Sequence, residues 1–330
     1  MKRVTICVPT YNSEATLRAT LDSVLAQTYS NLVVKIFDNA SIDKTVQIAR
    51  EYAMKDQRVQ VFAHPENVGG EGNFNRCIQA AEGEYMAIYH ADDLYEKNMV
   101  EKQVEFLEAH ADSVAVATGA SLIDSVGHEH GLRFLPPPLR NRAQVEFRFE
   151  DLLRLTLKYG NFITCPSVMA RANVYRDQIG RFRGELFGTS SDLDVWLRFA
   201  KLGRFGLLTA PLMRYRVSEA SFTVRETKRR FTEHDLLRTL RHYVTDKNDG
   251  LKLSARDVRY LKFHELKDAA ARRMNIVLSL RTDHPLPNFG GSWLDVLTMA
   301  VESRYHLKFA LASFVIFALT TPLKWLRIFK

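Results

Sequence analysis

The sequence predicts an α/β fold with a mostly parallel, doubly wound sheet. Short β-branched runs alternate with segments of helical periodicity through the first 120 residues. Strands that alternate with helices need crossover connections, and these build parallel sheets with helices on both faces. The chain has 330 residues, of which 46% are hydrophobic and 25% charged, so it can bury a sizeable core. This composition excludes a disordered chain and a polytopic membrane protein.

The first part of the chain defines the expected elements in order. Strands are expected at residues 4–8, 33–37, 59–63, 85–89 and 114–118. Helices are expected at residues 14–27, 45–54 and 73–81, and along the apolar stripe of Val100, Val104 and Leu107. Asn12 or Ser13 is the expected start of the first helix, and Asp43 is the expected cap of the second.

The pattern changes after residue 120. Residues 121–160 carry the loop signal Leu135-Pro136-Pro137-Pro138 and then a helical stretch near residues 150–158, which we interpret as an insertion. Signals for strands and helices return at residues 161–216. Beyond residue 223 the chain is helical and basic, and Leu236, Leu240 and Tyr243 are spaced for one buried face. We therefore expect one domain at residues 1–222 and a helical region at 223–330.

The C-terminal region carries a charge-free run at residues 309–323, between Lys308 and Lys324. A spanning helix needs ~20 apolar residues, and Pro322 is expected to interrupt the end of this run. Apolar residues bordered by Trp325 and basic residues are typical of a helix that lies in the membrane interface. We expect such a helix at about residues 306–330. Docking on the domain or in a dimer interface is the alternative.

The charge and the cysteines limit the partners and the compartment. A formal net charge of +8 suits nucleic acid, acidic lipid headgroups or sugar diphosphates. No stacking aromatics accompany the basic run, so we expect no nucleic-acid partner and interpret the run as a solvated helix face; its members are Arg225, Lys228, Arg229 and Arg230. The three cysteines are scattered singly, which predicts no disulfide framework and no zinc site. The sequence opens without a long apolar signal segment, so a reducing, cytoplasmic location is expected.

Polar residues follow three of the expected strands. These clusters are Pro9-Thr10-Tyr11-Asn12, Asp38-Asn39-Ala40-Ser41-Ile42-Asp43 and His90-Ala91-Asp92-Asp93. The carboxyl ends of parallel strands meet at one edge of a sheet, where ligands bind, so we expect the clusters to converge. Asp92 and Asp93 repel each other unless a cation intervenes, and Mg²⁺ or Mn²⁺ prefers carboxylate oxygen. The alternative is that both acids only begin the next helix.

These motifs resemble those of family 2 glycosyltransferases of the GT-A fold, over about residues 1–220. The first two clusters are similar to the nucleotide loop and the second strand-end motif of that family. Glu66-Asn67-Val68-Gly69-Gly70 resembles its Asn-x-Gly segment, and His90-Ala91-Asp92-Asp93 its metal-binding DxD. Ser191-Asp192-Leu193-Asp194-Val195-Trp196-Leu197-Arg198 looks like its catalytic acidic segment.

The resemblance implies an activity and a location. It implies inverting, metal-dependent transfer of a sugar from a UDP- or dTDP-linked donor to a glycan or lipid-linked glycan acceptor. Such acceptors belong to cell-surface polysaccharide biosynthesis, and the C-terminal helix suggests work at the inner face of the cell membrane. Residues 1–120 would then be the nucleotide-binding half of the domain, and residues 121–222 the acceptor-side half. A sugar nucleotidyltransferase and a non-catalytic binding protein remain alternatives.

The resemblance also assigns roles to single residues. Asp192 would be the catalytic base, kept ionised by a helix N-terminus, although an N-cap role is the alternative. Asp92 and Asp93 would hold Mg²⁺ or Mn²⁺. The residues expected to bind the donor are Pro9, Thr10, Tyr11, Glu14, Asp38, Asn67, Gly69, Asn75, Asp92 and Asp93. Ser191, Trp196 and Arg198 would lie on the acceptor side, with core packing for Trp196 and a solvated charge for Arg198 as alternatives.

Four positions depart from the family pattern. His90 stands where an Asp is common, and Ser191 replaces the Glu that often precedes the base. Ser218 stands where relatives often have a His near the metal, and Phe74 where many have an Arg that contacts the diphosphate. The donor phosphates are therefore expected to depend more on the metal and on other cations.

Overall fold

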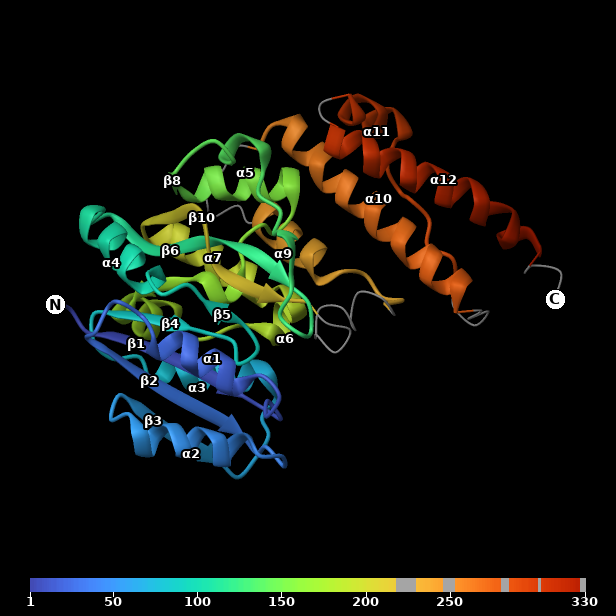
Figure 1. The fold of residues 1–330 in the computed structure, drawn as a ribbon. Coiled ribbons are helices and arrows are strands. Elements are labelled where there is room, and N and C mark those ends of the chain that lie inside the picture. Colours follow the sequence, from blue (N-terminus) through green and yellow to red (C-terminus); the bar gives the residue numbers. More distant parts are fainter. Residues whose placement is uncertain (218–229, 246–252, 280–284, 302–303, 327–330) are drawn as a thin grey trace. The chain divides into compact units, whose positions relative to one another are not determined.

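The computed structural model describes residues 1–217, 230–245, 253–279, 285–301 and 304–326, and it divides the chain into two compact units (Figure 1). Unit 1 comprises Met1–Leu153, Asn161–Leu186 and Ser191–Ser218, and unit 2 comprises Arg154–Gly160, Phe187–Ser190 and Glu219–Lys330. Two short segments of unit 2 thus precede the last part of unit 1 in the chain. The domain boundary near residue 222 stays a prediction. Ser218, Arg225, Lys228 and Arg229 lie outside the described residues.

Unit 1 is built on a mixed sheet of ten strands among the described residues. The strands are β1 (Val4–Thr10), β2 (Leu32–Asn39), β3 (Val59–His64), β4 (Tyr85–Ile88), β5 (Leu94–Tyr95), β6 (Ser113–Ile123), β7 (Glu129–Leu132), β8 (Gln144–Phe147), β9 (Met169–Arg171) and β10 (Arg204–Arg216). Their order is β3-β2-β1-β4-β9-β6-β10-β5, with β7 beside β6 and β8 beside β10.

The strands of the first part of the chain form a continuous parallel block. β3, β2, β1 and β4 pair in parallel, as do β6 and β10. The short strands β5, β7, β8 and β9 pair antiparallel with their neighbours. The predicted α/β sheet is therefore confirmed, and two of the antiparallel strands, β7 and β8, come from the region where the sequence pattern changes.

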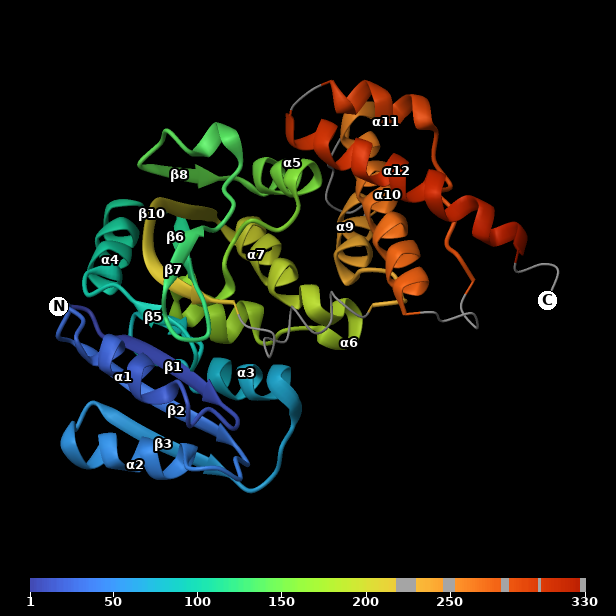
Figure 2. The same cartoon turned by 45° about the vertical axis from the view of Figure 1, so that its right-hand side comes forward.

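Helices cover both faces of this sheet, as the alternation of the sequence predicts. They are α1 (Leu17–Leu25), α2 (Thr45–Lys55), α3 (Gly69–Gln79), α4 (Met99–Ala109) and α7 (Ser191–Leu202). The chain also forms α5 (Phe149–Tyr159), α6 (Gly184–Phe187) and short helical turns at Pro137–Leu139, Cys165–Ser167, Val174–Ile179 and Gly188–Ser190. Figure 2 shows α1 and α2 side by side along β1–β3. Ile6 of β1 and Leu21 of α1 belong to the core on that face, whereas Cys7 points to the opposite face, where its thiol contacts the Cys77 carbonyl of α3 at 3.7 Å.

The first helix begins later than predicted, at Leu17 rather than residue 14. The backbone N–H groups of Ser13 and Glu14 donate to Thr45 Oγ1 (2.7 Å) and Asp43 Oδ2 (3.1 Å), so the loop after β1 is tied to the start of α2. Asn12 adopts a positive φ of 49°, which also prevents helical geometry there. Contacts about thirty residues away along the chain thus delay the helix.

Unit 2 is helical over its described part. Its helices are α9 (Asp235–Thr245), α10 (Ala255–Leu278), α11 (Trp293–Ala300) and α12 (Arg304–Leu326), and α10, α11 and α12 pack against one another. Leu240 and Tyr243 are buried as predicted, but Leu237 takes the buried place expected for Leu236. Helix α12 continues through Pro322, so the expected interruption is wrong. Proline removes only one hydrogen bond there, close to the end of the helix.

Candidate active site

The site lies at the point where the strand order of unit 1 reverses. β1 pairs in parallel with β2 on one side and with β4 on the other, so the loops after these three strands leave the same edge. Thr10 is in register with Asp38, and its hydroxyl donates to Asp38 Oδ1 at 3.1 Å. Helix α1 fixes the loop after β4, because the hydroxyls of Thr16 and Thr20 donate to the carbonyls of Ala91 and Asp93, each at 2.8 Å.

Asp38 is buried and anchors the loop that follows β2. Its carboxylate accepts hydrogen bonds from the Thr10 hydroxyl, from the Ser41 N–H (2.9 Å) and from the Ser41 hydroxyl (2.5 Å). Ala40, inside this turn, has a φ of 62°, in the left-handed region. Asp38 therefore sets the shape of the strand-end turn, and its contact with a nucleotide base stays a prediction.

Three other expected donor-binding residues lie after β3: Asn67 in the loop, Gly69 at the start of α3 and Asn75 within α3. Asn67 Oδ1 accepts from Asn39 Nδ2 and from the Gly69 N–H, both at 2.8 Å. Asn75 Oδ1 accepts from the Phe182 N–H at 2.8 Å.

On the β1 side of this edge the loop residues differ in exposure. Glu14 accepts from the Lys44 N–H at 3.0 Å. Tyr11 is half-exposed, and Pro9 is partly buried in β1. Tyr11 thus presents an aromatic surface beside the ordered turn of Asp38.

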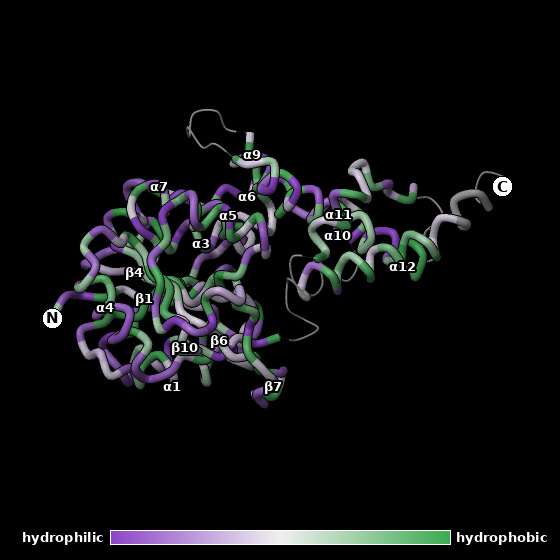
Figure 3. The backbone as a smooth tube through the Cα atoms, turned by 90° about the horizontal axis from the view of Figure 1, so that it is seen from above, coloured by the Kyte–Doolittle hydropathy of each residue, from purple (hydrophilic) through white to green (hydrophobic). Residues whose placement is uncertain are grey.

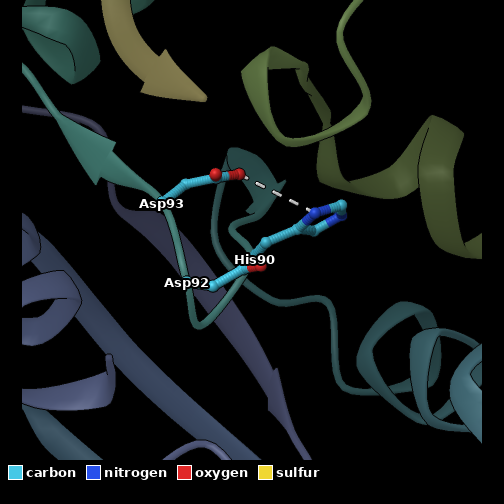
Figure 4. Close-up of side chains that lie close together, drawn as sticks. All are labelled: His90, Asp92 and Asp93. Atoms are coloured by element: carbon cyan, nitrogen blue, oxygen red, sulfur yellow. Dashed lines mark ion pairs between the residues drawn. The ribbon is translucent and has the colours of Figure 1, made fainter. Parts of the chain in front are cut away.

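A candidate metal centre lies in the loop after β4 (Figure 4). One ligand atom each from His90, Asp92 and Asp93 lies within 4.8 Å of the others, and His90 Nδ1 is 3.8 Å from Asp93 Oδ2. Asp93 is fully buried; one carboxylate oxygen accepts from the Arg216 N–H at 2.7 Å, whereas Oδ2 has no hydrogen-bond partner among the described residues. Burial raises the pKa of Asp93 well above its usual range, and the charge of Asp92 adds to the rise. A divalent cation would supply the partner that this oxygen lacks.

His90 adds a nitrogen ligand that the sequence reasoning did not assign. Burial lowers the pKa of the His90 imidazole, which favours the neutral form that binds metal ions. Its ring stacks on Phe74 with 5.5 Å between the ring centroids. Two departures from the family pattern, His90 and Phe74, thus lie in contact. Carboxylate oxygens are the ligands that Mg²⁺ and Mn²⁺ prefer, whereas an imidazole nitrogen is more typical of transition-metal ions.

The candidate base, Asp192, is the second residue of α7. Its Oδ1 accepts from the Leu193 N–H at 2.7 Å, and its Oδ2 accepts from Asn161 Nδ2 at 3.0 Å. Burial raises the pKa of Asp192 to about 6, against the lowering effect of these hydrogen bonds. The sequence suggested that the helix N-terminus keeps the pKa of Asp192 low. In the structure, burial outweighs that effect and raises the pKa. A carboxylate with a pKa near 6 is a stronger base than an exposed one and is still largely ionised at neutral pH.

Asp192 and the loop after β4 share electrostatic neighbours. Burial raises the pKa of the Cys165 thiol most, and the charges of Asp192 and Asp93 raise it further. The positive charge of Arg133 lowers the pKa of both carboxyls, against the larger effect of burial. Asp93 and Asp192, which are far apart in the chain, thus interact electrostatically with the same two residues, Cys165 and Arg133.

The three acceptor-side candidates have different environments. Ser191 begins α7 and is partly buried. Trp196 is only 1% exposed and lies in the core between Phe199 and Phe205. Arg198 forms an ion pair with the buried Asp194 and donates to the carbonyls of Ile179 and Arg181. The structure therefore shows Trp196 packed in the core and Arg198 engaged in an ion pair. Neither side chain is exposed to an acceptor.

The chain has the same fold as solved GT-A glycosyltransferases. The S. aureus protein TarS, residues 1–349, in complex with UDP, aligns with a TM-score of 0.56 at 18% identity, covering 94% of this chain and 89% of that one. A mannosyltransferase from Pyrobaculum calidifontis, in complex with GDP-Man and Mn²⁺, aligns with a TM-score of 0.57 at 18% identity, covering 96% and 85%.

The sequence defines the family within that class. The model of the family described as glycosyl transferase family 2 matches residues 5–177, and the chain belongs to this family. A Bacillus subtilis protein named as a glycosyltransferase, EpsE, is 31% identical over 225 residues, covering 68% of this chain and 73% of EpsE. TuaG of the same organism, named for teichuronic acid biosynthesis, is 30% identical over 200 residues, covering 61% and 73%. The recognition of the family from its motifs is confirmed.

Proposed function

We propose that this glycosyltransferase carries out inverting, metal-dependent transfer from a nucleotide diphosphate sugar, UDP- or dTDP-linked, to a glycan or lipid-linked glycan in cell-surface polysaccharide biosynthesis. One observation carries the proposal: the loops after β1, β2 and β4 converge at one sheet edge, with Asp93 and Asp192 sharing electrostatic neighbours there. The complexes of TarS with UDP and of the mannosyltransferase with GDP-Man and Mn²⁺ support a nucleotide and a metal as ligands.

The chemistry assigned to this chain centres on Asp192. Its carboxylate takes the proton of the acceptor hydroxyl while the acceptor oxygen bonds to the anomeric carbon, and the bond from that carbon to the diphosphate breaks. Attack opposite the leaving group inverts the anomeric centre and needs no covalent intermediate on the enzyme. Asn161 holds the carboxylate by its hydrogen bond to Oδ2. A divalent cation held by His90, Asp92 and Asp93 would offset the charge that grows on the departing diphosphate.

A binding screen tests the donor and metal assignments together. We would measure the thermal stabilisation of the protein by UDP, dTDP and GDP, each with Mn²⁺, with Mg²⁺ or with a chelator. We expect stabilisation by UDP or dTDP that requires the metal and is lost in Asp92→Ala. The replacement Asp112→Ala, an exposed acid before β6, is the matched control and should bind normally. Binding that ignores both the chelator and Asp92→Ala would disprove the metal role.

We also propose that unit 2 contacts the membrane surface through the outer face of α11 and α12. Figure 3 shows hydrophobic residues along much of α12. Large apolar side chains are exposed on these helices at Leu294, Leu297, Val301, Leu307, Leu311, Phe314, Val315 and Leu319. Within the described ranges, no helix combines the length and apolar character that crossing a bilayer requires. A surface of this kind suits burial in the headgroup region of a bilayer.

The basic run identified in the sequence is only partly described, because Arg225, Lys228 and Arg229 lie outside the described residues. Arg230, which the sequence suggested to be a solvated charge, instead forms an ion pair with the buried Asp268. Its side chain therefore serves the fold of unit 2 rather than an anionic partner. Lys308 is exposed at the start of α12 and is available to a lipid headgroup.

A further inference from the structure

Arg133 is held beside the candidate site by contacts from two strands of unit 1. Its N–H donates to the Ala120 carbonyl of β6 at 2.9 Å, directly after the β6–β7 pairing. Its guanidinium lies over the ring of Tyr215, 5.2 Å from the centroid. The next residue of β10, Arg216, donates its N–H to the carboxylate of Asp93. The guanidinium of Arg133 therefore lies against the end of β10, whose Arg216 N–H binds a carboxylate of the candidate metal centre.

The hydrogen-bonding capacity of Arg133 is not used within the described chain. Its Nε is buried and has no hydrogen-bond partner there, and no carboxylate of the described residues forms an ion pair with it. Arg216 is different, because its Nε and Nη1 donate to the carbonyls of Asp92, Asp124 and Ser125. A guanidinium carries five donors, and a buried donor without an acceptor is unfavourable. The geometry of Arg133 thus indicates an anionic ligand.

Two side chains of α3 are already engaged in contacts with other described residues. On α3, Phe74 stacks on His90, and Arg76 donates to Asn39 Oδ1 at 3.0 Å and to the Glu66 carbonyl at 3.3 Å. Arg133 lowers the pKa of both Asp93 and Asp192, although burial dominates at each. The positive charge of Arg133 therefore affects both Asp93 of the candidate metal centre and the candidate base Asp192.

We propose that Arg133 binds the diphosphate of the donor, donating from its guanidinium to the non-bridging phosphate oxygens. This inference rests on the proposed function. The planar guanidinium matches phosphate oxygens in pairs, which an ammonium group does not. Stacking on Tyr215 restricts the side chain before the ligand arrives, so little rotational freedom is lost on binding. As the bond to the sugar breaks, negative charge grows on the diphosphate and the interaction strengthens.

The test compares a diphosphate with its nucleoside. Arg133→Met keeps an unbranched side chain against Tyr215 but removes the charge. Arg140→Met is the matched control, because Arg140 also lies over an aromatic ring, that of Phe134 at 5.6 Å, and donates to the Leu135 carbonyl. Binding of UDP with Mn²⁺ is measured by calorimetry, and binding of uridine by ligand-observed NMR. If dTDP or GDP binds the wild type more tightly, that nucleotide and its nucleoside are used.

We expect Arg133→Met to weaken diphosphate binding ~10-fold or more and to leave nucleoside binding unchanged. The diphosphate affinity of Arg133→Lys should lie between those of the wild type and Arg133→Met. Arg140→Met should bind the diphosphate as the wild type does. The Tm of Arg133→Met should not fall. Unchanged diphosphate affinity in Arg133→Met would overturn the inference and leave the proposed function standing. Equal losses for diphosphate and nucleoside would also overturn it, because the role would then be structural. No binding of any of the three diphosphates to the wild type would remove both proposals.

Discussion

The two units treat buried charge differently. In unit 2, the buried Asp268 accepts hydrogen bonds from Arg230, from Arg272 at 2.8 Å and from the His234 N–H at 3.0 Å. In unit 1, Asp93 is equally buried, but one of its oxygens has no hydrogen-bond partner among the described residues.

The comparison separates two uses of a buried acid. An acid whose oxygens are all paired holds the fold, because removing it leaves its partners uncompensated. An acid that is left incompletely paired destabilises the fold and is retained where a ligand completes it. Helix α7 carries a related contrast. Asp194 pairs with two cations, Arg183 and Arg198. Among the described residues Asp192, two residues earlier, accepts hydrogen bonds only from neutral donors, and its pKa is raised to about 6.

The largest effect on stability is expected from Asp194→Ala. This change leaves Arg183 and Arg198 without their buried partner, and we expect unfolding to become easier by about 3 kcal/mol. Urea unfolding followed by tryptophan fluorescence measures it, because Trp196 lies on the same helix. Asp112→Ala, the exposed acid before β6, serves as the control and should unfold close to the wild type. An Asp194→Ala protein as stable as the wild type would break the comparison.

The converse change, Asp192→Asn, should affect catalysis instead. The amide still offers an oxygen to the Leu193 N–H but does not accept a proton, so we expect turnover to fall ~10²-fold or more. Affinity for the nucleotide should stay nearly unchanged. Initial rates and calorimetry on the same preparation provide both values. Wild-type turnover in Asp192→Asn would exclude this residue as the base.

The sequence allowed the sheet and the convergence of its strand ends to be predicted, because both depend on local patterns. Alternating periodicity defines β1 to β4 and their helices, and the strand-end rule then places Thr10, Asp38 and Asp92 at one edge. The late start of α1 was not predictable, since it depends on the acceptors of Asp43 and Thr45 some thirty residues onward.

The supporting side chains of the site were also beyond local patterns. In the sequence, His90 only replaces an acid that is common at this position in the family. Its position beside Asp93 and Phe74 in the structure makes it a candidate ligand. Arg133 carries no motif, and its meaning depends on Tyr215 from a distant strand. A lone arginine after a short exposed strand gave no signal in the sequence. Burial of Trp196 likewise depends on tertiary packing with Phe205.

The pH dependence of turnover should show the raised pKa of Asp192. The base must be ionised, so turnover should rise with pH through about 6 and level off above it. At pH 5 the ionised fraction is roughly a tenth of its plateau, because each pH unit below the pKa lowers it about tenfold. A rate profile that is flat from pH 5 to pH 8 would contradict the assignment.

The same pKa predicts the sign of a stability change. A carboxyl whose pKa is raised by folding contributes stability that is full below the unfolded pKa, ~3.9, and is lost as the pH rises through about 6. The wild type should therefore lose stability between pH 4 and pH 7 relative to Asp192→Asn, which has no charge to bury. Parallel urea titrations of the two proteins measure this difference.

The smallest and least specific effect is expected on the outer face of unit 2. Replacing Phe314 and Leu319 by serine removes exposed apolar surface from α12 without touching its buried residues, so the helix should remain folded. Sedimentation with vesicles that contain anionic lipid should fall several-fold, because each large side chain contributes ~1.5–3 kcal/mol when fully buried and part of that here. Val126→Ser, an equally exposed apolar change in unit 1, is the control and should leave sedimentation unchanged. If the double variant sediments like the wild type, the apolar face of α12 is covered by protein instead, and a concentration-dependent change in oligomeric state should appear in its place.

The two units would bind different partners in different ways. Unit 1 would bind the soluble donor through incompletely paired charge, and unit 2 would hold the enzyme at the membrane surface through uncovered apolar side chains.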